Sequence, residues 1–363
     1  MTNLAQDTSS TTAGKRILIG GYYGFENFGD ELIAQVIIDH LRQYGAEPVL
    51  LSAEPQKTAR QYGVEAVGRT DVKAIWHTMK HCHGFIIGGG GLFQDKTGPL
   101  SPVYYGGLMM MAAVARRPIA FFAQGVGPLK RLLSQWILGF VINRANLIVV
   151  RDRASQEYLK TCTKKGVYLM ADPGWLVGNL IPKTTDLTVP PKGIGVSLRP
   201  WPDLTSKAIG QVAETLMQIP GVQDHGVNLI DCHAGTDMAA LARLEAHLKR
   251  LKVPYRWFHS HQVIEGILAS ELVVAMRFHA LLVAAALSRP VVGLAYDPKV
   301  RYLMGQINGL CFEPDQWETL AQTVADDHNV QDWLKPDTLK GIIDLKRAAQ
   351  QGFEQLDQWL NKL

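Results

Sequence analysis

Short apolar runs alternate with longer segments of helical periodicity along almost the whole chain. The first run covers residues 16–20, and the last clear pair covers residues 272–275 and 291–294. Runs of this length, separated by helices, are typical of strands that are joined by crossover connections. The alternation therefore predicts parallel sheets with helices on both faces, which is an α/β fold.

One polar stretch divides this alternation into two halves. Residues 178–192 (GNLIPKTTDLTVPPK) contain three prolines and are expected to form a linker. We expect a disordered polar tail at 1–15, an N-terminal domain at 16–177 and a second domain at 193–337. An amphipathic helix at 338–363 would cross back to the first domain. The predicted architecture has two Rossmann-like, doubly wound domains that face each other across a cleft, as in glycosyltransferase-B-like proteins.

Composition excludes several classes of protein. The chain has 363 residues, a formal net charge of +4 and no Lys/Arg run longer than three, so a nucleic-acid partner is not expected. A mildly basic chain is compatible with an anionic substrate or with peripheral contact with an anionic membrane. The four cysteines form no CxxC pair, which argues against a disulfide framework and against a zinc site.

The most membrane-like segment is too short and too polar to span a bilayer. It covers residues 132–150 and is interrupted by Asn143, Arg144 and Asn146. The first fourteen residues lack the apolar core of a signal peptide. A cytoplasmic protein is expected, with contact at the inner face of the plasma membrane as the compatible association.

Two glycine-rich loops follow predicted strands in the first half. The loop at 21–30 (GYYGFENFGD) precedes a helix for which Asp30 is the expected N-cap, and Gly88–Gly91 follows the strand at 84–87. The loop at 21–30 matches neither GxGxxG nor a Walker A motif, and the close backbone partner of the glycine run is either a ligand or that loop. Asn27 and Asp30 are suited to bonding sugar hydroxyls, although a plain strand-to-helix turn is the alternative.

Basic residues occupy the corresponding positions elsewhere. Arg277 and His279 form a corner between an apolar strand and an apolar helix, and cations buried there require an anionic partner. Lys299 follows the next strand. The alternatives are a core histidine that caps its helix for His279 and a surface residue for Lys299. The basic set of strand-end residues is Arg151, Arg199, Arg277, His279 and Lys299, and the polar-acidic set is Asn27, Asp30, Asp95, Asp172 and Asp237.

These motifs, taken in order, resemble the polysaccharide pyruvyl transferase family. The matching segments are GFENFGDE at 24–31, the glycine run at 88–91, Arg151–Asp152, Ala171–Asp172–Pro173 and MRFHA at 276–280. The segment YDPK at 296–299 resembles the CsaB-like branch, which modifies cell-envelope polysaccharides. The resemblance covers roughly residues 15–310.

The resemblance implies an enzyme that makes a cyclic ketal from phosphoenolpyruvate and two hydroxyls of one sugar, in a lipid-linked or exopolysaccharide precursor. Phosphoenolpyruvate would be a co-substrate, with no further cofactor and no metal. The implied donor-binding residues are Arg151, Arg277, Phe278, His279 and Lys299. The implied acceptor-binding residues are Gly24, Asn27, Asp30, Gly90, Asp95 and Arg199. The implied catalytic residues are His279, Arg277, Asp30 and Asp172.

Two other classes of function remain open from the residues. A sugar-nucleotide glycosyltransferase of the same fold would offer an acidic pair for the ribose and a glycine-rich diphosphate loop, whereas this chain has Arg277–Phe278–His279 at the corresponding turn. A non-catalytic polysaccharide-binding protein would present exposed aromatic platforms.

Overall fold

The computed structural model describes residues 14–95, 100–182, 184–185, 190–202, 204–219, 221–313, 316 and 335–363. Most of the predicted tail and parts of the predicted linker and second domain therefore lie outside the described residues. The chain divides into two compact units. Unit 1 contains the chain up to Phe25, Ile33–Pro173 and Ala348–Leu363, and unit 2 contains Glu26–Leu32 and Gly174–Arg347.

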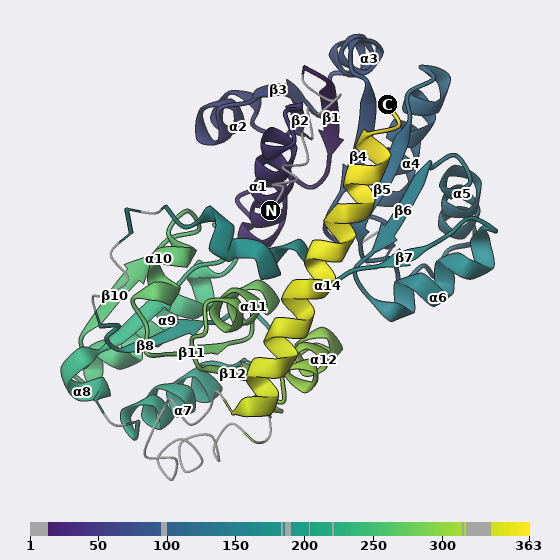
Figure 1. The fold of residues 1–363 in the computed structure, drawn as a ribbon. Coiled ribbons are helices and arrows are strands. Elements are labelled where there is room, and N and C mark those ends of the chain that lie inside the picture. The colour runs from purple at the N-terminus through teal and green to yellow at the C-terminus, as the bar shows by residue number, and fades with distance from the viewer. Residues whose placement is uncertain are drawn as a thin grey trace, which may run out of the picture. The chain divides into compact units, whose positions relative to one another are not determined.

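Unit 1 is built on a seven-stranded sheet with the order β3-β2-β1-β4-β5-β6-β7 (Figure 1). All its neighbouring strands are parallel. Its strands are β1 (Arg16–Gly20), β2 (Glu47–Ser52), β3 (Glu65–Gly68), β4 (Gly84–Gly88), β5 (Ile119–Gln124), β6 (Leu147–Val150) and β7 (Tyr168–Leu169).

The helices of unit 1 cover both faces of this sheet. They are α1 (Phe28–Gln43, which belongs to unit 1 from Ile33 onwards), α2 (Pro55–Tyr62), α3 (Val72–His81), α4 (Leu100–Val114), α5 (Leu132–Ile142) and α6 (Arg153–Cys162). Right-handed crossovers place helices that lead towards β7 on one face and those that lead towards β3 on the other. Consistent with this rule, α3 packs on α4, α4 on α5 and α5 on α6.

Unit 2 repeats the design with a six-stranded parallel sheet of order β10-β9-β8-β11-β12-β13. Its strands are β8 (Ile194–Ser197), β9 (Val227–Ile230), β10 (Tyr255–Phe258), β11 (Leu272–Ala275), β12 (Val291–Leu294) and β13 (Leu310–Phe312). The helices are the 3₁₀ segment η1 (Pro173–Leu180, which starts at the unit boundary), α7 (Ser206–Met217), α8 (Val222–His225), α9 (Met238–Arg250), α10 (Val263–Leu268), α11 (Phe278–Ala286) and α12 (Pro298–Gln306).

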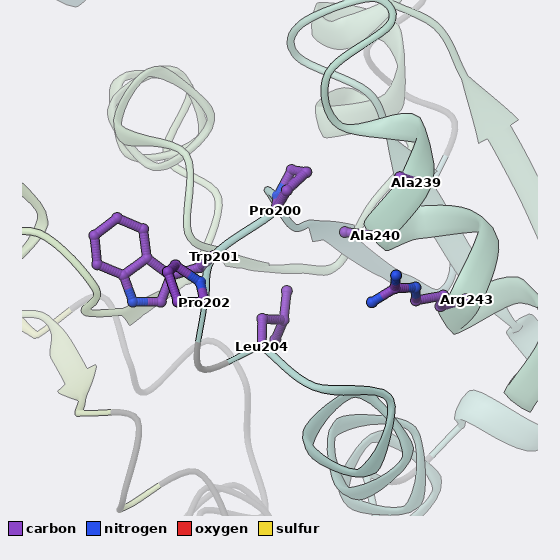
Figure 2. A pocket seen from close by; sticks show the side chains of 7 residues that line it. All are labelled: Pro200, Trp201, Pro202, Leu204, Ala239, Ala240 and Arg243. Carbon is purple, nitrogen blue, oxygen red and sulfur yellow. The ribbon is translucent and has the colours of Figure 1, made fainter. Parts of the chain in front are cut away.

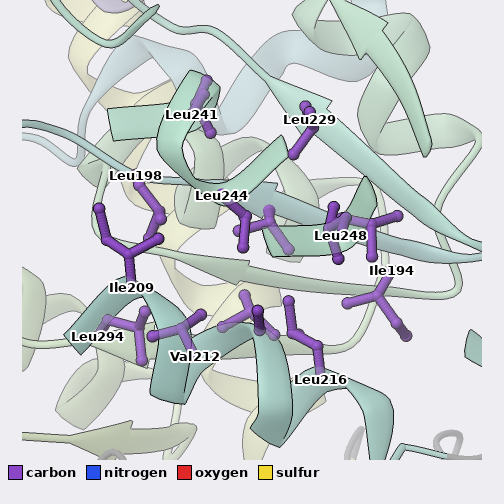
Figure 3. Packing of buried hydrophobic residues seen from close by; sticks show 14 of the residues in the cluster. Ile194, Leu198, Ile209, Val212, Leu216, Leu229, Leu241, Leu244, Leu248 and Leu294 are labelled. Carbon is purple, nitrogen blue, oxygen red and sulfur yellow. The ribbon is translucent and has the colours of Figure 1, made fainter. Parts of the chain in front are cut away.

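The core of unit 2 forms where α7 and α9 meet the sheet. Figure 3 shows Leu216 on α7 and Leu244 and Leu248 on α9 packed together beside Ile194 of β8. Each of these side chains is 2% exposed or less. Burying one such side chain stabilises the fold by about 1.5–3 kcal/mol, so this apolar layer holds the strand ends in place.

The amphipathic helix predicted at 338–363 is α14 (Pro336–Leu360), and its two parts belong to different units. The part from Ala348 onwards packs within unit 1. The Phe353 ring lies 4.4 Å from the His40 ring, and His40 Nε2 lies 2.6 Å from Asp357 Oδ1. The last turn of α14 is therefore anchored on α1.

The architecture confirms the predicted fold class, because both sheets are parallel and Rossmann-like. Within the described ranges, no helix is both long enough and apolar enough to cross a membrane.

Candidate functional site

The strand order reverses once in each sheet, and these reversals mark the expected ligand sites. In unit 2 the chain proceeds from β8 to one side and from β11 to the other, so the reversal lies between these two strands. In unit 1 it lies between β1 and β4. Ligands of open α/β sheets bind beyond the carboxyl ends of the strands at such points.

Arg277 follows β11 in unit 2 and is fixed by a buried carboxylate. Its Nε donates to Asp237 Oδ2 at 2.8 Å and to Oδ1 at 3.1 Å, and its Nη2 donates to Oδ1 as well. The Asp237 side chain is fully buried and that of Arg277 is 14% exposed. Burial disfavours the charged guanidinium, but the hydrogen bonds and charge of Asp237 outweigh it and raise the pKa of Arg277. The guanidinium is thus a permanent cation in a set orientation.

His279 lies in the first turn of α11, directly after the Arg277 corner. Its ring meets the Phe278 ring edge-on at 5.1 Å. A Cβ atom added to Gly29 would overlap the His279 ring, so the backbone at Gly29 approaches the imidazole as closely as glycine allows. The helix begins at Phe278, so its unpaired backbone N–H groups lie beside the same corner.

The segment Glu26–Leu32 belongs to unit 2, although the sequence analysis placed it in the N-terminal domain. Backbone bonds attach it to the loop after β9: Phe28 donates to the Cys232 carbonyl at 2.9 Å, and Asn27 forms a bridge with His233. Within the segment, Asn27 Nδ2 donates to Asp30 Oδ2 at 2.7 Å. The main chain therefore brings Asn27, Gly29 and Asp30 to the strand ends of unit 2. Periodicity within the segment does not encode these backbone bonds.

The loop after β9 adds an acid and a histidine with shifted protonation. Asp231 is 1% exposed, and burial raises its pKa. Burial lowers the pKa of His233, and the positive charge of Arg277 lowers it further. His233 is therefore biased towards its neutral form at this edge of the sheet.

Arg199 and Tyr296 pair across the loops after β8 and β12. Arg199 Nη1 donates to the Tyr296 hydroxyl at 3.0 Å, and its Cζ lies 5.0 Å from the centre of the Tyr296 ring. The Trp201 ring lies 5.1 Å from Tyr296. Lys299 is in the first turn of α12, where its backbone N–H donates to the capping carboxylate of Asp297 at 3.1 Å.

A pocket of about 360 Å³ lies within unit 2 beside the start of α9 (Figure 2). The loop after β8 forms one wall, and Arg243 extends its guanidinium from α9 towards Leu204. The lining residues are Pro200, Trp201, Pro202, Leu204, Ala239, Ala240 and Arg243. Ala239, which lines the pocket, is two residues from Asp237 in the sequence.

Backbone carbonyls and glycines line the point in unit 1 where the strand order reverses. The Tyr23 hydroxyl donates to the Gly88 carbonyl at 2.5 Å, and Gln124 Nε2 donates to the Gly89 carbonyl at 2.9 Å. Gly89 and Gly90 have φ values of 71° and 78°, which side chains disfavour. The glycine run is thus required by the turn that it makes.

Arg151 in unit 1 forms an ion pair with Asp172. Its Nη1 donates to Asp172 Oδ2 at 2.6 Å, with the two side chains 21% and 4% exposed. Asp95 lies in the same unit and accepts the backbone N–H groups of Lys130 and Arg131 at 2.9 and 2.7 Å. The Lys130 bond and then the Arg131 bond lower the pKa of Asp95. Asp95 therefore acts as the anchor of that loop.

The residues proposed from sequence fall into two groups that do not follow the donor and acceptor roles. Unit 2 holds Asn27, Asp30, Arg199, Arg277, Phe278, His279 and Lys299. Unit 1 holds Gly24, Gly90, Asp95, Arg151 and Asp172. Residues expected to bind the donor and residues expected to bind the acceptor thus occur together in unit 2. Arg151, which is also expected to bind the donor, lies in unit 1.

Two contributors were missed as site residues. Asp237 was noted among the acidic strand-end residues without a partner, and His233 was given no role. The signal for Asp237 was present, because a buried arginine requires an anionic partner and Asp237 is one of the acidic residues that follow a strand. No cluster of three or more potential metal-ligating side chains occurs in the part of the chain that the structure describes.

Comparisons with known proteins identify the family of the chain. The family model for polysaccharide pyruvyl transferase matches residues 27–298. The amylovoran biosynthesis protein AmsJ of Erwinia amylovora is 23% identical over 256 residues, which cover 63% of this chain and 60% of AmsJ. The chain thus matches less than two thirds of the length of this relative.

Solved structures share the fold at low identity. Anabaena HepE in complex with UDP and glucose has a TM-score of 0.61 at 15% identity, covering 96% of this chain and all of that one. MnaA of S. aureus with UDP has a TM-score of 0.61 at 10% identity, with 96% and 98% covered. The structural likeness establishes the architecture. The family match extends from the Asn27 segment to the end of the Tyr296 loop, and by this match the chain belongs to the polysaccharide pyruvyl transferase family.

Proposed function

We propose that this protein transfers the pyruvyl group of phosphoenolpyruvate to two hydroxyls of one sugar, forming a cyclic ketal and releasing phosphate. The observation that carries the proposal is the Arg277–Asp237 pair, fixed beside His279 at the start of α11 in a member of this family. A fixed cation at a helix N-terminus is suited to an anionic donor.

The donor would be held through its carboxylate and phosphate. Asp237 engages Nε and Nη2 of Arg277, while Nη1 makes no hydrogen bond to any described residue. This nitrogen and the N–H groups of the first turn of α11 would face the donor. Arg151 and Lys299 are the further cations that we assign to it.

The chemistry requires one proton donor and one base. His279 would protonate the methylene carbon of the donor, which makes the central carbon electrophilic. One sugar hydroxyl adds to that carbon and loses its proton to a carboxylate, for which Asp30 and Asp172 are the candidates. The second hydroxyl then displaces phosphate and the ring closes. The phosphate leaves with the proton of that hydroxyl. Arg277 would stabilise the charge on carboxylate and phosphate.

The acceptor is proposed to be a saccharide of a cell-envelope polysaccharide or exopolysaccharide precursor. The name of AmsJ, an amylovoran biosynthesis protein, supports a polysaccharide pathway. Asn27 and Asp30, joined by their own hydrogen bond, would bind its hydroxyls together with Arg199. Gly24 and Gly90 would allow close approach in unit 1. A CsaB-like branch and action at the inner face of the plasma membrane are parts of this proposal.

Sugar-nucleotide glycosyl transfer is the second candidate, because HepE and MnaA share the fold and were solved with UDP or UDP-sugars. Mass spectrometry of candidate saccharides incubated with phosphoenolpyruvate separates the two. The mass gain of one pyruvyl ketal with equimolar phosphate release is expected. Glycosyl transfer from UDP-sugars with no reaction of phosphoenolpyruvate would overturn the proposal.

A pair of histidine variants tests the site itself. His279→Ala should abolish ketal formation, whereas His225→Ala is the matched control. His225 lies on α8, is 41% exposed and pairs with Glu271. Wild-type turnover by His279→Ala would remove His279 from the mechanism.

A further inference from the structure

Helix α5 is strongly apolar, yet one side of it is exposed. It contains no charged residue between Leu132 and Ile142, and Leu138, Val141 and Ile142 pack inwards. Its outer side, named here the apolar face, consists of Leu132, Leu133, Trp136 and Phe140, with exposures of 82%, 55%, 66% and 40%. The outer side of a surface helix is normally polar, and a helix that is apolar all round is normally covered.

The aromatic side chains of the apolar face are held in a stack. The rings of Trp136 and Phe140 lie 5.4 Å apart and within 8° of parallel. Arg144, one turn further on, has its Cζ 3.6 Å from the centre of the Phe140 ring and donates from Nη1 to the Phe140 carbonyl at 2.5 Å. A cation thus lies over the face of one of the exposed rings, within the apolar face itself.

Basic residues bound the apolar face at both ends, without acidic neighbours in the sequence. Lys130 and Arg131 are exposed immediately before α5, where Asp95 fixes their backbone. Between Lys96 and Val150 the sequence has six basic residues and no acidic one. The sequence around α5 is therefore more basic than the chain as a whole.

Helix α4 extends this surface. A Cβ atom on Gly106 would lie 2.6 Å from Ile137, so the absence of a side chain there allows α4 and α5 to pack closely. On α4, Leu100 and Val103 are 78% and 45% exposed, and the helix carries no charged residue. Two neighbouring helices of unit 1 therefore present apolar side chains to solvent.

We propose that the apolar face, with Lys130, Arg131 and Arg144, docks on a bilayer that contains anionic lipids. The leucine and aromatic side chains would enter the interfacial layer and the three cations would meet lipid headgroups. A second copy of this chain fits less well, because a two-fold dimer would place the same cations opposite one another. The inference deepens the part of the proposed function that places the protein at a membrane, and it is argued from α4 and α5 without use of the catalytic residues.

Vesicle co-sedimentation of the full chain tests the proposal. Wild type should sediment with vesicles of mixed phosphatidylglycerol and phosphatidylcholine, less with phosphatidylcholine alone, and less at high salt. Lys130→Gln with Arg131→Gln should raise the lipid concentration for half-binding about 30-fold at low salt. Trp136→Ala with Phe140→Ala should raise it about tenfold or more on both kinds of vesicle.

Matched changes on α14 provide the controls. Lys340→Gln with Arg347→Gln removes the same charge, and Ile343→Ala removes a side chain that is 55% exposed. Both should leave binding at the wild-type level. Absence of wild-type binding to anionic vesicles, or equal losses in the controls, would overturn the proposal. A wild-type dimer that Trp136→Ala with Phe140→Ala dissociates without lipid, combined with no vesicle binding, would instead identify an interface between copies.

Discussion

An Arg–Asp pair lies at the carboxyl edge of each sheet, and the two pairs are built differently. In unit 2, Asp237 is fully buried and receives both Nε and Nη2 of Arg277. In unit 1, Arg151 donates to Asp172 from Nη1, and the Arg151 side chain is more exposed than that of Arg277, at 21% against 14%. The first pair holds the guanidinium at two nitrogens, and the second holds it at one.

The difference bears on what each arginine can do for a ligand. Two-point attachment fixes the plane of a guanidinium, so Arg277 offers a charge that needs no reorganisation when a transition state forms. Single-point attachment constrains the plane of the Arg151 guanidinium less. We therefore assign Arg277 to stabilising the reacting groups and Arg151 to completing donor binding.

Exchange of each arginine for lysine is expected to have the largest and most unequal effects on the two pairs. Arg277→Lys keeps the charge but loses the fork, and its kcat with phosphoenolpyruvate should fall on the order of 10²–10³-fold. Arg151→Lys should act mainly on KM, by about tenfold. Lysine is the right replacement, because alanine at 277 would leave Asp237 buried without a partner, at a cost of about 3–5 kcal/mol in stability.

Steady-state kinetics and urea unfolding of both variants decide this comparison. Equal losses of kcat in the two variants would show that the two-point attachment has no catalytic consequence. A loss of activity by Arg277→Lys that is matched by a collapse of its unfolding midpoint would assign the residue to the fold.

A glycine packs against a proposed site residue in each unit, and its substitution is expected to have a moderate effect on kcat. A Cβ atom on Gly29 would overlap the His279 ring, whereas one on Gly125 would lie 3.2 Å from Arg151 Nε. Gly29→Ala should displace the imidazole and lower kcat on the order of 10²-fold, because a small misplacement of a catalytic group costs about that much. Gly125→Ala should lower kcat less than about tenfold, since the arginine side chain can yield.

Gly305→Ala on α12 is the control for these substitutions, because its Cβ would meet no atom within 4 Å. It should leave turnover unchanged. If Gly29→Ala retained the turnover of this control, close packing of Gly29 on His279 would have no part in catalysis.

Most of the fold could be predicted from the sequence, because each buried strand of this sheet type is a compact apolar run. Helix α2 could not be predicted, because only Thr58 and Tyr62 of its eight mostly polar residues are buried. The adjoining β3 at the sheet edge has one exposed and three half-buried residues. Helices and edge strands that bury little leave no strong periodicity to detect.

The candidate site was recoverable where chemistry alone identifies a residue. Arg277 and His279 stood out because cations rarely lie between apolar elements. The attachment of Asn27 to unit 2 was not recoverable, because it depends on backbone bonds between Phe28 and Cys232 and between Glu26 and Ala234. Such bonds are independent of residue type, so no composition or spacing records them.

A still smaller effect is expected on the pH dependence of stability, through His233 in the loop after β9. His233 has a folded-state pKa below the usual histidine value of about 6.5, through burial and then through Arg277. Below about pH 6.5 the unfolded chain therefore binds more protons at this residue than the folded chain. The contribution of neutral His233 to stability is complete above that pH and is lost as the pH falls through the folded-state pKa. Urea midpoints of wild type should consequently fall more steeply than those of His233→Gln between about pH 7 and pH 5. Parallel curves would mean that His233 titrates alike in both states, and the electrostatic distinction between the two Arg–Asp pairs would then not extend to the loop after β9.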